Sequence, residues 1–185
     1  MADHKSHLAG KRILAVDDEA DILETIEDIL DIADVDSVRD YEGASAKIRT
    51  GSYDLAILDI MGVNGLALLE ETVSRGIPTV MLTAHAVNPD TLLASIRKGA
   101  IAYLPKETLA ELDHLLEELL AAQAAGKPPW KIVFDELGTY FDKRFGSDWK
   151  AKDEAFWSDF ARNWAVGRGI QERLKHDARL RDKEV

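Results

Sequence analysis

Five short strand-like runs, separated by helix-sized segments, constrain the fold of this chain more than any other feature of its sequence. Short, largely apolar runs bounded by other sequence are typical of buried parallel strands. A more polar run at Val35–Arg39 suits a strand near a sheet edge. The other four runs are Ile13–Val16, Leu55–Leu58, Thr79–Leu82 and Ile101–Leu104.

The segments between these runs show the spacing of amphipathic helices. One helix is expected to begin at Asn88, whose side chain can cap it, with Pro89 in the first turn. Another is expected to begin at Thr108, because Thr108 and Glu111 match a capping box. Two further apolar helix faces are expected: Ile22, Ile26, Ile29 and Ala33, then Leu66, Leu69 and Val73.

The order strand then helix, repeated five times, predicts a doubly wound α/β domain over residues 10–124. We expect a five-stranded parallel sheet with helices on both faces. Gly126 to Pro129 would stop the last helix, so residues 125–129 are predicted as a linker and residues 130–185 as a small helical extension. In such folds ligands bind beyond the carboxyl ends of the strands.

Charge and composition exclude several classes of function. Residues 1–126 hold 10 basic against 23 acidic residues, which argues against a nucleic-acid surface there because phosphates would be repelled. Residues 127–185 hold 13 basic against 11 acidic residues. The absence of cysteine excludes disulfides, thiolate metal sites and a cysteine nucleophile. Without a secretory pattern or a membrane-length apolar run, we expect a cytoplasmic protein with no membrane segment.

Polar residues end four of the expected strands. Asp17 and Asp18 follow the first, Asp59 follows the third, Thr83 the fourth and Lys106 the fifth. Carboxylates brought together there would repel one another, and a hard cation such as Mg²⁺ or Mn²⁺ would relieve the repulsion. Asp59 could then attack a phosphoryl group, with Lys106 and the Thr83 hydroxyl contacting its oxygens.

Four segments resemble the response-regulator receiver family in order and spacing: ILAVDDEADI, YDLAILDIMGVNGLALL, IPTVMLTA and KGAIAYLPK. The resemblance covers about residues 11–122 and implies a flavodoxin-like, five-stranded sheet of strand order 2-1-3-4-5. It implies a bacterial two-component protein that accepts a phosphoryl group on Asp59 from a histidine kinase or a phosphotransfer protein. Two departures stand out: the stretch Asp59–Gly65 is shorter than the family's loop and lacks its proline, and Pro105 precedes Lys106 where the family usually has a following proline.

The resemblance also assigns roles to the other residues of the site. It implies that Asp18, Asp59 and the backbone carbonyl of Met61 bind Mg²⁺ directly, whereas Asp17 binds it through water. Thr83 matches the family's switch hydroxyl. Tyr103 matches its switch aromatic, which turns inward when the hydroxyl moves toward the phosphoryl group.

The extension contains all four tryptophans of the chain. Two short helices cannot bury so much aromatic area alone. Either they pack on each other and on the receiver, or they form a homodimer or partner-binding surface. The segment from Arg168 to Val185 is expected to be a solvated helix or a frayed end. The expected apolar faces are Trp130, Val133, Phe134, Leu137, Phe141 and Phe145 in the first helix, and Trp157, Phe160 and Trp164 in the second.

Three functions are open at this stage. The first is a phosphorylation-controlled switch that acts by protein contact with an unidentified output protein, through the fourth and fifth helices or the extension. Apart from its own phosphotransfer, it would not be an enzyme. The second is a DNA-binding transcriptional regulator, against which the small and barely basic extension argues. The third is a phosphatase-like hydrolase resembling the haloacid dehalogenase family, whose Asp-x-Asp motif does not match the stretch Asp17–Asp21.

Overall fold

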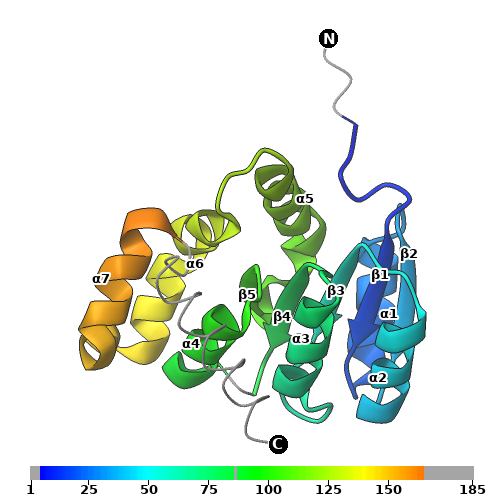
Figure 1. Ribbon diagram of the computed structural model, residues 1–185, viewed down its shortest axis with the longest axis horizontal. Coiled ribbons are helices and arrows are strands. Elements are labelled where there is room, and N and C mark those ends of the chain that lie inside the picture. Colours follow the sequence, from blue (N-terminus) through cyan, green and yellow to red (C-terminus); the bar gives the residue numbers. More distant parts are fainter. Residues whose placement is uncertain (1–4, 86, 165–185) are drawn as a thin grey trace, which may run out of the picture.

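The computed structural model describes residues 5–85 and 87–164 (Figure 1). A five-stranded parallel sheet of order β2-β1-β3-β4-β5 forms its centre, which confirms the predicted fold. The register aligns Leu58 of β3 with Met81 of β4, and Met81 with Tyr103 of β5. The strands are β1 (Arg12–Val16), β2 (Asp34–Val38), β3 (Leu55–Leu58), β4 (Thr79–Thr83) and β5 (Ala102–Pro105).

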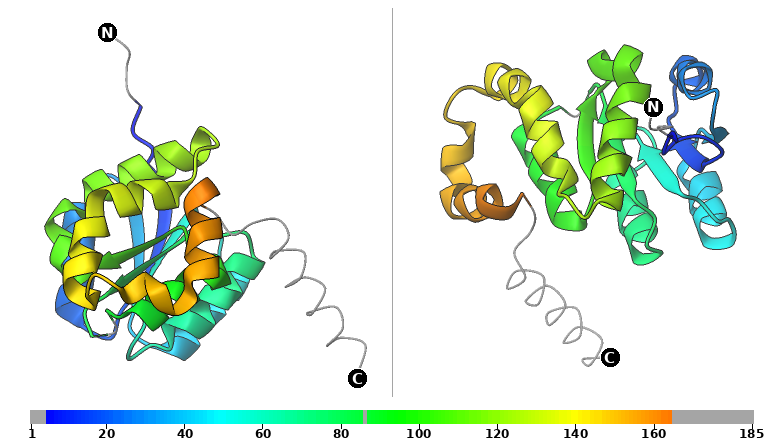
Figure 2. Two further views of the ribbon diagram at one scale, coloured as in Figure 1. Left: turned by 90° about the vertical axis from the view of Figure 1, so that its left-hand side faces the viewer. Right: turned by 90° about the horizontal axis from the view of Figure 1, so that it is seen from above.

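Helices cover both faces of the sheet. In Figure 2, α1 and α5 lie together on one face, whereas α2, α3 and α4 follow one another along the other face. The helices are α1 (Ala20–Ile29), α2 (Tyr41–Thr50), α3 (Gly65–Ser74), α4 (Pro89–Lys98) and α5 (Leu112–Ala124). No helix in the described ranges is both long and apolar enough to cross a bilayer.

Several elements form where their sequence predicts them. β1, β3 and β4 are buried on both faces, as their apolar runs require. The Asn88 side chain accepts a hydrogen bond from the backbone amide of Thr91 at 2.9 Å, and Pro89 lies in the first turn of α4. Gly99, at φ +100°, then ends that helix in the left-handed conformation.

Two local predictions are wrong. The expected capping box at Thr108 does not form, because Lys106–Glu111 adopt a 3₁₀ helix, η1, in which the Thr108 hydroxyl donates to the Pro105 carbonyl at 2.7 Å. Val73 was expected on the buried face of α3 but is 38% exposed, since that helix buries the stripe of Leu68, Leu69 and Thr72 instead. The next helix begins at Pro129, the last residue of the predicted linker.

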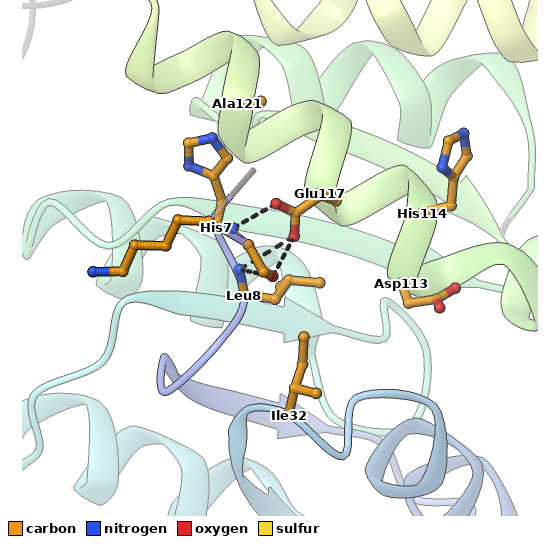
Figure 3. Close-up of a pocket in the computed structure, with 9 residues that line it drawn as sticks. His7, Leu8, Ile32, Asp113, His114, Glu117 and Ala121 are labelled. Carbon is orange, nitrogen blue, oxygen red and sulfur yellow. Dashed lines mark hydrogen bonds between the residues drawn. The ribbon is translucent and has the colours of Figure 1, made fainter. Parts of the chain in front are cut away.

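A segment before β1 is fastened to α5 through Glu117 (Figure 3). The Glu117 carboxylate accepts hydrogen bonds from the amide of His7 at 2.5 Å, the hydroxyl of Ser6 at 2.9 Å and the amide of Leu8 at 3.3 Å. Burial alone would raise the pKa of Glu117, but these donors lower it. Leu8 is buried beside an open pocket of about 510 Å³. The arrangement braces the N-terminal segment against α5.

The extension forms helix α6 (Pro129–Phe145), the 3₁₀ helix η2 (Trp149–Asp153) and helix α7 (Glu154–Asn163), and α6 lies against α5 and β5 (Figures 1 and 2). The ring of Phe134 contacts the rings of five other aromatic residues. Within residues 129–164 no large apolar side chain is exposed. The aromatic residues therefore pack on one another and on the receiver, as the first of the two alternatives states. The segment Arg168–Val185 lies outside the described residues.

Candidate functional site

Three carboxylates meet at the carboxyl edge of the sheet. Asp17 follows β1 and Asp59 follows β3, and these neighbouring strands are joined there by a hydrogen bond from the Asp59 amide to the Val16 carbonyl at 3.0 Å. One oxygen each of Asp17, Asp18 and Asp59 lies within 4.8 Å of the others. Asp17 and Asp59 are only 2% and 4% exposed, whereas Asp18 faces solvent. The three residues form a half-buried acidic pocket.

Lys106 projects into this pocket from the first residue after β5. Its ammonium nitrogen lies 2.8 Å from Asp17 Oδ2, 3.4 Å from Asp59 Oδ2 and 3.7 Å from Glu19 Oε2. Burial alone would lower the pKa of Lys106, but the carboxylates of Asp17 and Asp59 raise it. Lys106 therefore stays protonated and supplies a fixed positive charge.

The buried carboxylates are not fully compensated by this lysine. Burial raises the pKa of Asp17, and burial together with the Asp17 charge raises the pKa of Asp59, although Lys106 opposes both shifts. The carboxylates outnumber the single ammonium group, so the pocket keeps excess negative charge. Its donors are carboxylate oxygens, which suit a hard divalent cation better than a soft one.

Two glycines allow the loop after β3 to lie against the pocket. A Cβ atom on Gly62, which has φ +82°, would lie 2.6 Å from the Asp18 carboxyl group, and one on Gly65 would lie 1.7 Å from the Asp59 carbonyl oxygen. The Asp59 carboxylate also accepts a hydrogen bond from the Ile60 amide at 2.9 Å. The short loop is visible in the sequence, but no role was predicted for these glycines; their clustering after a strand was the available signal.

Thr83 and Tyr103 lie on the neighbouring strands β4 and β5. Thr83 is fully buried, and its hydroxyl has no hydrogen-bond partner among the described residues. The Tyr103 hydroxyl lies 2.8 Å from the Thr91 hydroxyl and accepts a hydrogen bond from the Asn88 amide at 3.3 Å. Tyr103 thus connects β5 to the start of α4.

Two residues at the mouth of the pocket complete it. Met61 is 55% exposed, so its side chain lies outside the pocket, and the role of its backbone carbonyl stays a prediction. Glu19 had no role in the sequence analysis, yet its carboxylate lies 3.6 Å from His85 Nε2 as well as near Lys106. Its position directly after the Asp17–Asp18 pair was the signal that it would face the same pocket.

Comparisons with known proteins agree with this geometry. The family model of the response regulator receiver domain matches residues 13–119. The transcriptional regulatory protein TcrA of Mycobacterium tuberculosis is 29% identical over 153 residues, covering 80% of this chain and 59% of that protein. The phosphate regulon transcriptional regulatory protein PhoB of Klebsiella pneumoniae is 32% identical over 123 residues, covering 60% of this chain and 53% of that protein. The chain thus spans less than two thirds of both relatives.

A solved structure gives the same result. The receiver domain protein from Methanospirillum hungatei JF-1, described as CheY-like, superposes with a TM-score of 0.58 at 30% identity and covers 64% of this chain and 99% of its own. A solved receiver-sized chain therefore matches about two thirds of this one. With the family model matched over more than half of its length, the chain belongs to the response regulator receiver domain family of two-component signalling.

Proposed function

We propose that this chain is a phosphorylation-controlled switch in which Asp59 accepts a phosphoryl group from a histidine kinase or phosphotransfer protein. The observation that carries the proposal is the position of the Asp59 carboxylate, buried beside both Lys106 and the carboxylates of Asp17 and Asp18. In the transfer, an Asp59 oxygen bonds to phosphorus as the bond from phosphorus to the donor nitrogen breaks. Lys106 balances the negative charge on the phosphoryl oxygens.

The acidic pocket would hold Mg²⁺ or Mn²⁺ through Asp17, Asp18, Asp59 and the backbone carbonyl of Met61. When bound, the cation supplies positive charge that offsets the carboxylates and the transferred group. Support comes from the excess of carboxylates over ammonium groups and from the raised pKa values of Asp17 and Asp59. Apart from this self-catalysed transfer, we propose no enzymatic activity.

Thr83 and Tyr103 would transmit the change. The Thr83 hydroxyl is buried without a protein partner, so a phosphoryl oxygen on Asp59 would offer it the hydrogen bond that it lacks. Tyr103 would follow because the two side chains emerge on one face of adjacent strands, as the pairing of Thr83 with Pro105 and of Met81 with Tyr103 requires. The phosphoryl group would thereby favour one of two conformations.

We propose protein contact rather than DNA binding as the output. The two curated relatives compared above are named transcriptional regulators, which makes DNA the second candidate. However, residues 129–164 hold six basic against seven acidic residues, and their aromatic side chains are turned inward. No basic stripe is available on this part of the chain for a phosphate backbone.

We further propose a receiver over residues 10–124, a linker over 125–129, an extension over 130–185, and a cytoplasmic location.

Intact-mass measurement after incubation with acetyl phosphate and Mg²⁺ tests the proposal. Wild type should gain one phosphoryl-sized mass increment, and Asp59→Asn should gain none. Asp21→Asn is the matched control, because it removes an exposed carboxylate from the start of α1. It should behave as wild type, and chelation of the metal should abolish the gain in both. An unmodified wild-type protein would overturn the assignment of Asp59.

A further inference from the structure

We propose that Lys150 is a methylation site, and that three aromatic rings of the extension form a cage for its methylated ammonium group. The rings belong to Phe134 on α6, Trp149 on η2 and Trp157 on α7, and Lys150 itself lies on η2. Helices α6 and α7 lie side by side (Figures 1 and 2). The inference does not depend on phosphorylation of Asp59, so the two proposals are tested separately.

The ammonium group of Lys150 lies over all three rings of this cage. Its nitrogen is 5.1 Å from the ring centroid of Phe134, 5.3 Å from that of Trp149 and 5.5 Å from that of Trp157. The faces of aromatic rings attract cations, and several rings around one cation are the arrangement that binds quaternary ammonium groups. The other cation–π contacts of the described residues involve arginine and a single ring each. Lys150 is therefore distinguished from the other lysines of this part of the chain.

The walls of the cage are held in place by their neighbours. The ring of Trp157 stands at 72° to the rings of both Trp149 and Phe134, with centroids 4.9 and 5.9 Å away. The Trp149 indole nitrogen donates a hydrogen bond of 2.9 Å to the Asp142 carboxylate, which fixes that ring. All three aromatic residues are buried. Because the walls are already ordered, a cation that enters the cage does not have to immobilise them.

The distances in the cage suit a methylated ammonium group better than a bare one. A methyl carbon in van der Waals contact with a ring lies about 3.5–4 Å from it, and a single carbon–nitrogen bond is about 1.45 Å long. A nitrogen that directs one methyl group at each ring would therefore lie about 5–5.5 Å from the centroids. The three distances from Lys150 fall within this range. A bare ammonium group, which carries only hydrogens, leaves part of the space between nitrogen and rings unfilled.

Methylation would cost Lys150 no hydrogen bond within the described residues. Its nitrogen forms no hydrogen bond or ion pair there, whereas Lys106 and Lys131 contact carboxylates. Methyl groups keep the positive charge and replace N–H donors. The Lys150 side chain is also exposed, so a modifying enzyme can reach it. Both the cage and the access to it therefore favour this modification.

The reaction requires a sulfonium compound as methyl donor. After losing a proton to solvent, the Lys150 nitrogen attacks the methyl carbon. The carbon–nitrogen bond forms as the carbon–sulfur bond breaks, its electron pair stays on sulfur, and the donor leaves as a neutral thioether. The nitrogen regains its positive charge in each transfer, and the third transfer replaces its last hydrogen. The product is a trimethylammonium group that the rings can bind through its charge and its methyl groups.

The first test uses the absence of cysteine from the chain. Lys150→Cys introduces a single thiol, which bromoethyl trimethylammonium or bromoethylamine converts into a lysine analogue with or without three methyl groups. Thermal unfolding of both full-length products would be followed by tryptophan emission. We expect the trimethylated product to melt about 2–4 °C higher, because the rings stabilise a weakly hydrated cation more than a strongly hydrated one.

Lys152→Cys is the matched control for this measurement. Lys152 is exposed on the same 3₁₀ helix, and its ammonium group has no cation–π contact among the described residues. Its two alkylated products should melt at the same temperature. Equal melting temperatures for the two Lys150→Cys products would overturn the cage, and so would a difference of the same size at both positions.

The second test asks whether the modification occurs in cells. Peptide mass spectrometry on the chain isolated from the cells that naturally make it, in several growth phases, would locate one to three added methyl groups. We expect them on Lys150 and not on Lys152. A Lys150 that is unmodified or acetylated in every phase would overturn the methylation site, since acetylation removes the charge that the rings attract.

Discussion

The carboxyl edge of the sheet and the α6–α7 extension are both well buried, but they bury opposite kinds of chemistry. The edge buries Asp17 and Asp59, and this raises the pKa of both carboxyl groups. The extension buries aromatic rings with centroids 4.9 to 6.3 Å apart, which carry no charge. Burial therefore costs stability at the first region and contributes it at the second. We expect a bound cation to offset the cost at the first region, whereas the second region needs no ligand.

Removing an aromatic ring from the extension should have the largest effect. Phe134→Ala deletes the ring that contacts five others, and we expect a loss of about 3–5 kcal/mol in the free energy of unfolding. Glu136→Ala, on the exposed side of α6, is the control and should cost under about 0.5 kcal/mol. Urea denaturation followed by tryptophan emission measures both. A loss below about 1 kcal/mol in Phe134→Ala would contradict the view that the rings form a cooperative core.

Asp36 accepts hydrogen bonds from two side chains, so its ionised form should stabilise the fold, unlike the carboxylates of the site. Burial would raise the pKa of Asp36, but the bonds from Lys47 and Tyr53 lower it. The Tyr53 hydroxyl lies 2.6 Å from Asp36, and burial followed by this bond raises the pKa of Tyr53 to about 12. We expect Tyr53→Phe to cost about 2 kcal/mol, typical of a hydrogen bond to a charged group.

The pH dependence of that cost follows from the raised pKa of Tyr53. A raised pKa means that the folded state favours the protonated phenol, so the stabilisation is complete below pH 10 and is lost as the pH rises through about 12. The difference in unfolding free energy between wild type and Tyr53→Phe, measured across this range, isolates the group. A difference that stayed constant to pH 12 would mean that the bond contributes nothing to the folded state.

Filling the space above the acidic pocket should have an intermediate effect. Gly62→Ala places a methyl group 2.6 Å from the Asp18 carboxyl group in a left-handed backbone, at a cost of about 1–3 kcal/mol. Gly76→Ala is matched in φ, at +71° against +82°, but has nothing within 4 Å. Only Gly62→Ala should also weaken Mg²⁺ binding, by about tenfold, when titrated by calorimetry. Equal affinity in both variants would separate the loop from the cation site.

Neutralising Asp59 should have the smallest effect, and in the opposite direction. Because the pKa of Asp59 is raised by burial and by Asp17, its ionised form destabilises the metal-free protein at neutral pH. Asp59→Asn should raise stability by about 1 kcal/mol, or the melting temperature by about 2–4 °C. Wild type should approach the variant as the pH falls through the raised pKa. Added Mg²⁺ should stabilise wild type more than the variant.

The edge of the sheet was predictable because its signals are local. Asp17, Asp18, Asp59 and Lys106 each lie within two residues of the end of a short apolar run. Since the carboxyl ends of parallel strands meet at one edge, the approach of these residues follows from topology. The prediction of a capping box at Thr108 was wrong because its residue types also suit a 3₁₀ turn. The prediction for the buried face of α3 was wrong because Gly65 and Thr72 also lie on the inner face of this helix. A pattern of apolar residues alone leaves them out.

The position of the extension on the receiver was not predictable in this way. Helical spacing gave both of its helices, since Trp130, Phe134 and Phe141 recur on one face. The contact of Trp130 with Ala100 joins residues from separate elements and leaves no periodic signal in either. The same holds for Glu117 and the segment Ser6–Leu8. Pairings between distant residues depend on the assembled shape of the sheet.

The fastening of Ser6–Leu8 to Glu117 has a consequence for synthesis of the chain. Because synthesis runs from the N-terminus, this segment leaves the ribosome about a hundred residues before its partner on α5. At about 5–20 residues per second, the segment waits several seconds before it can be fixed. β5 similarly stays uncovered until α6 has left the ribosome. The nascent receiver therefore passes through a period in which its N-terminal segment and one edge of its sheet are both open to other chains.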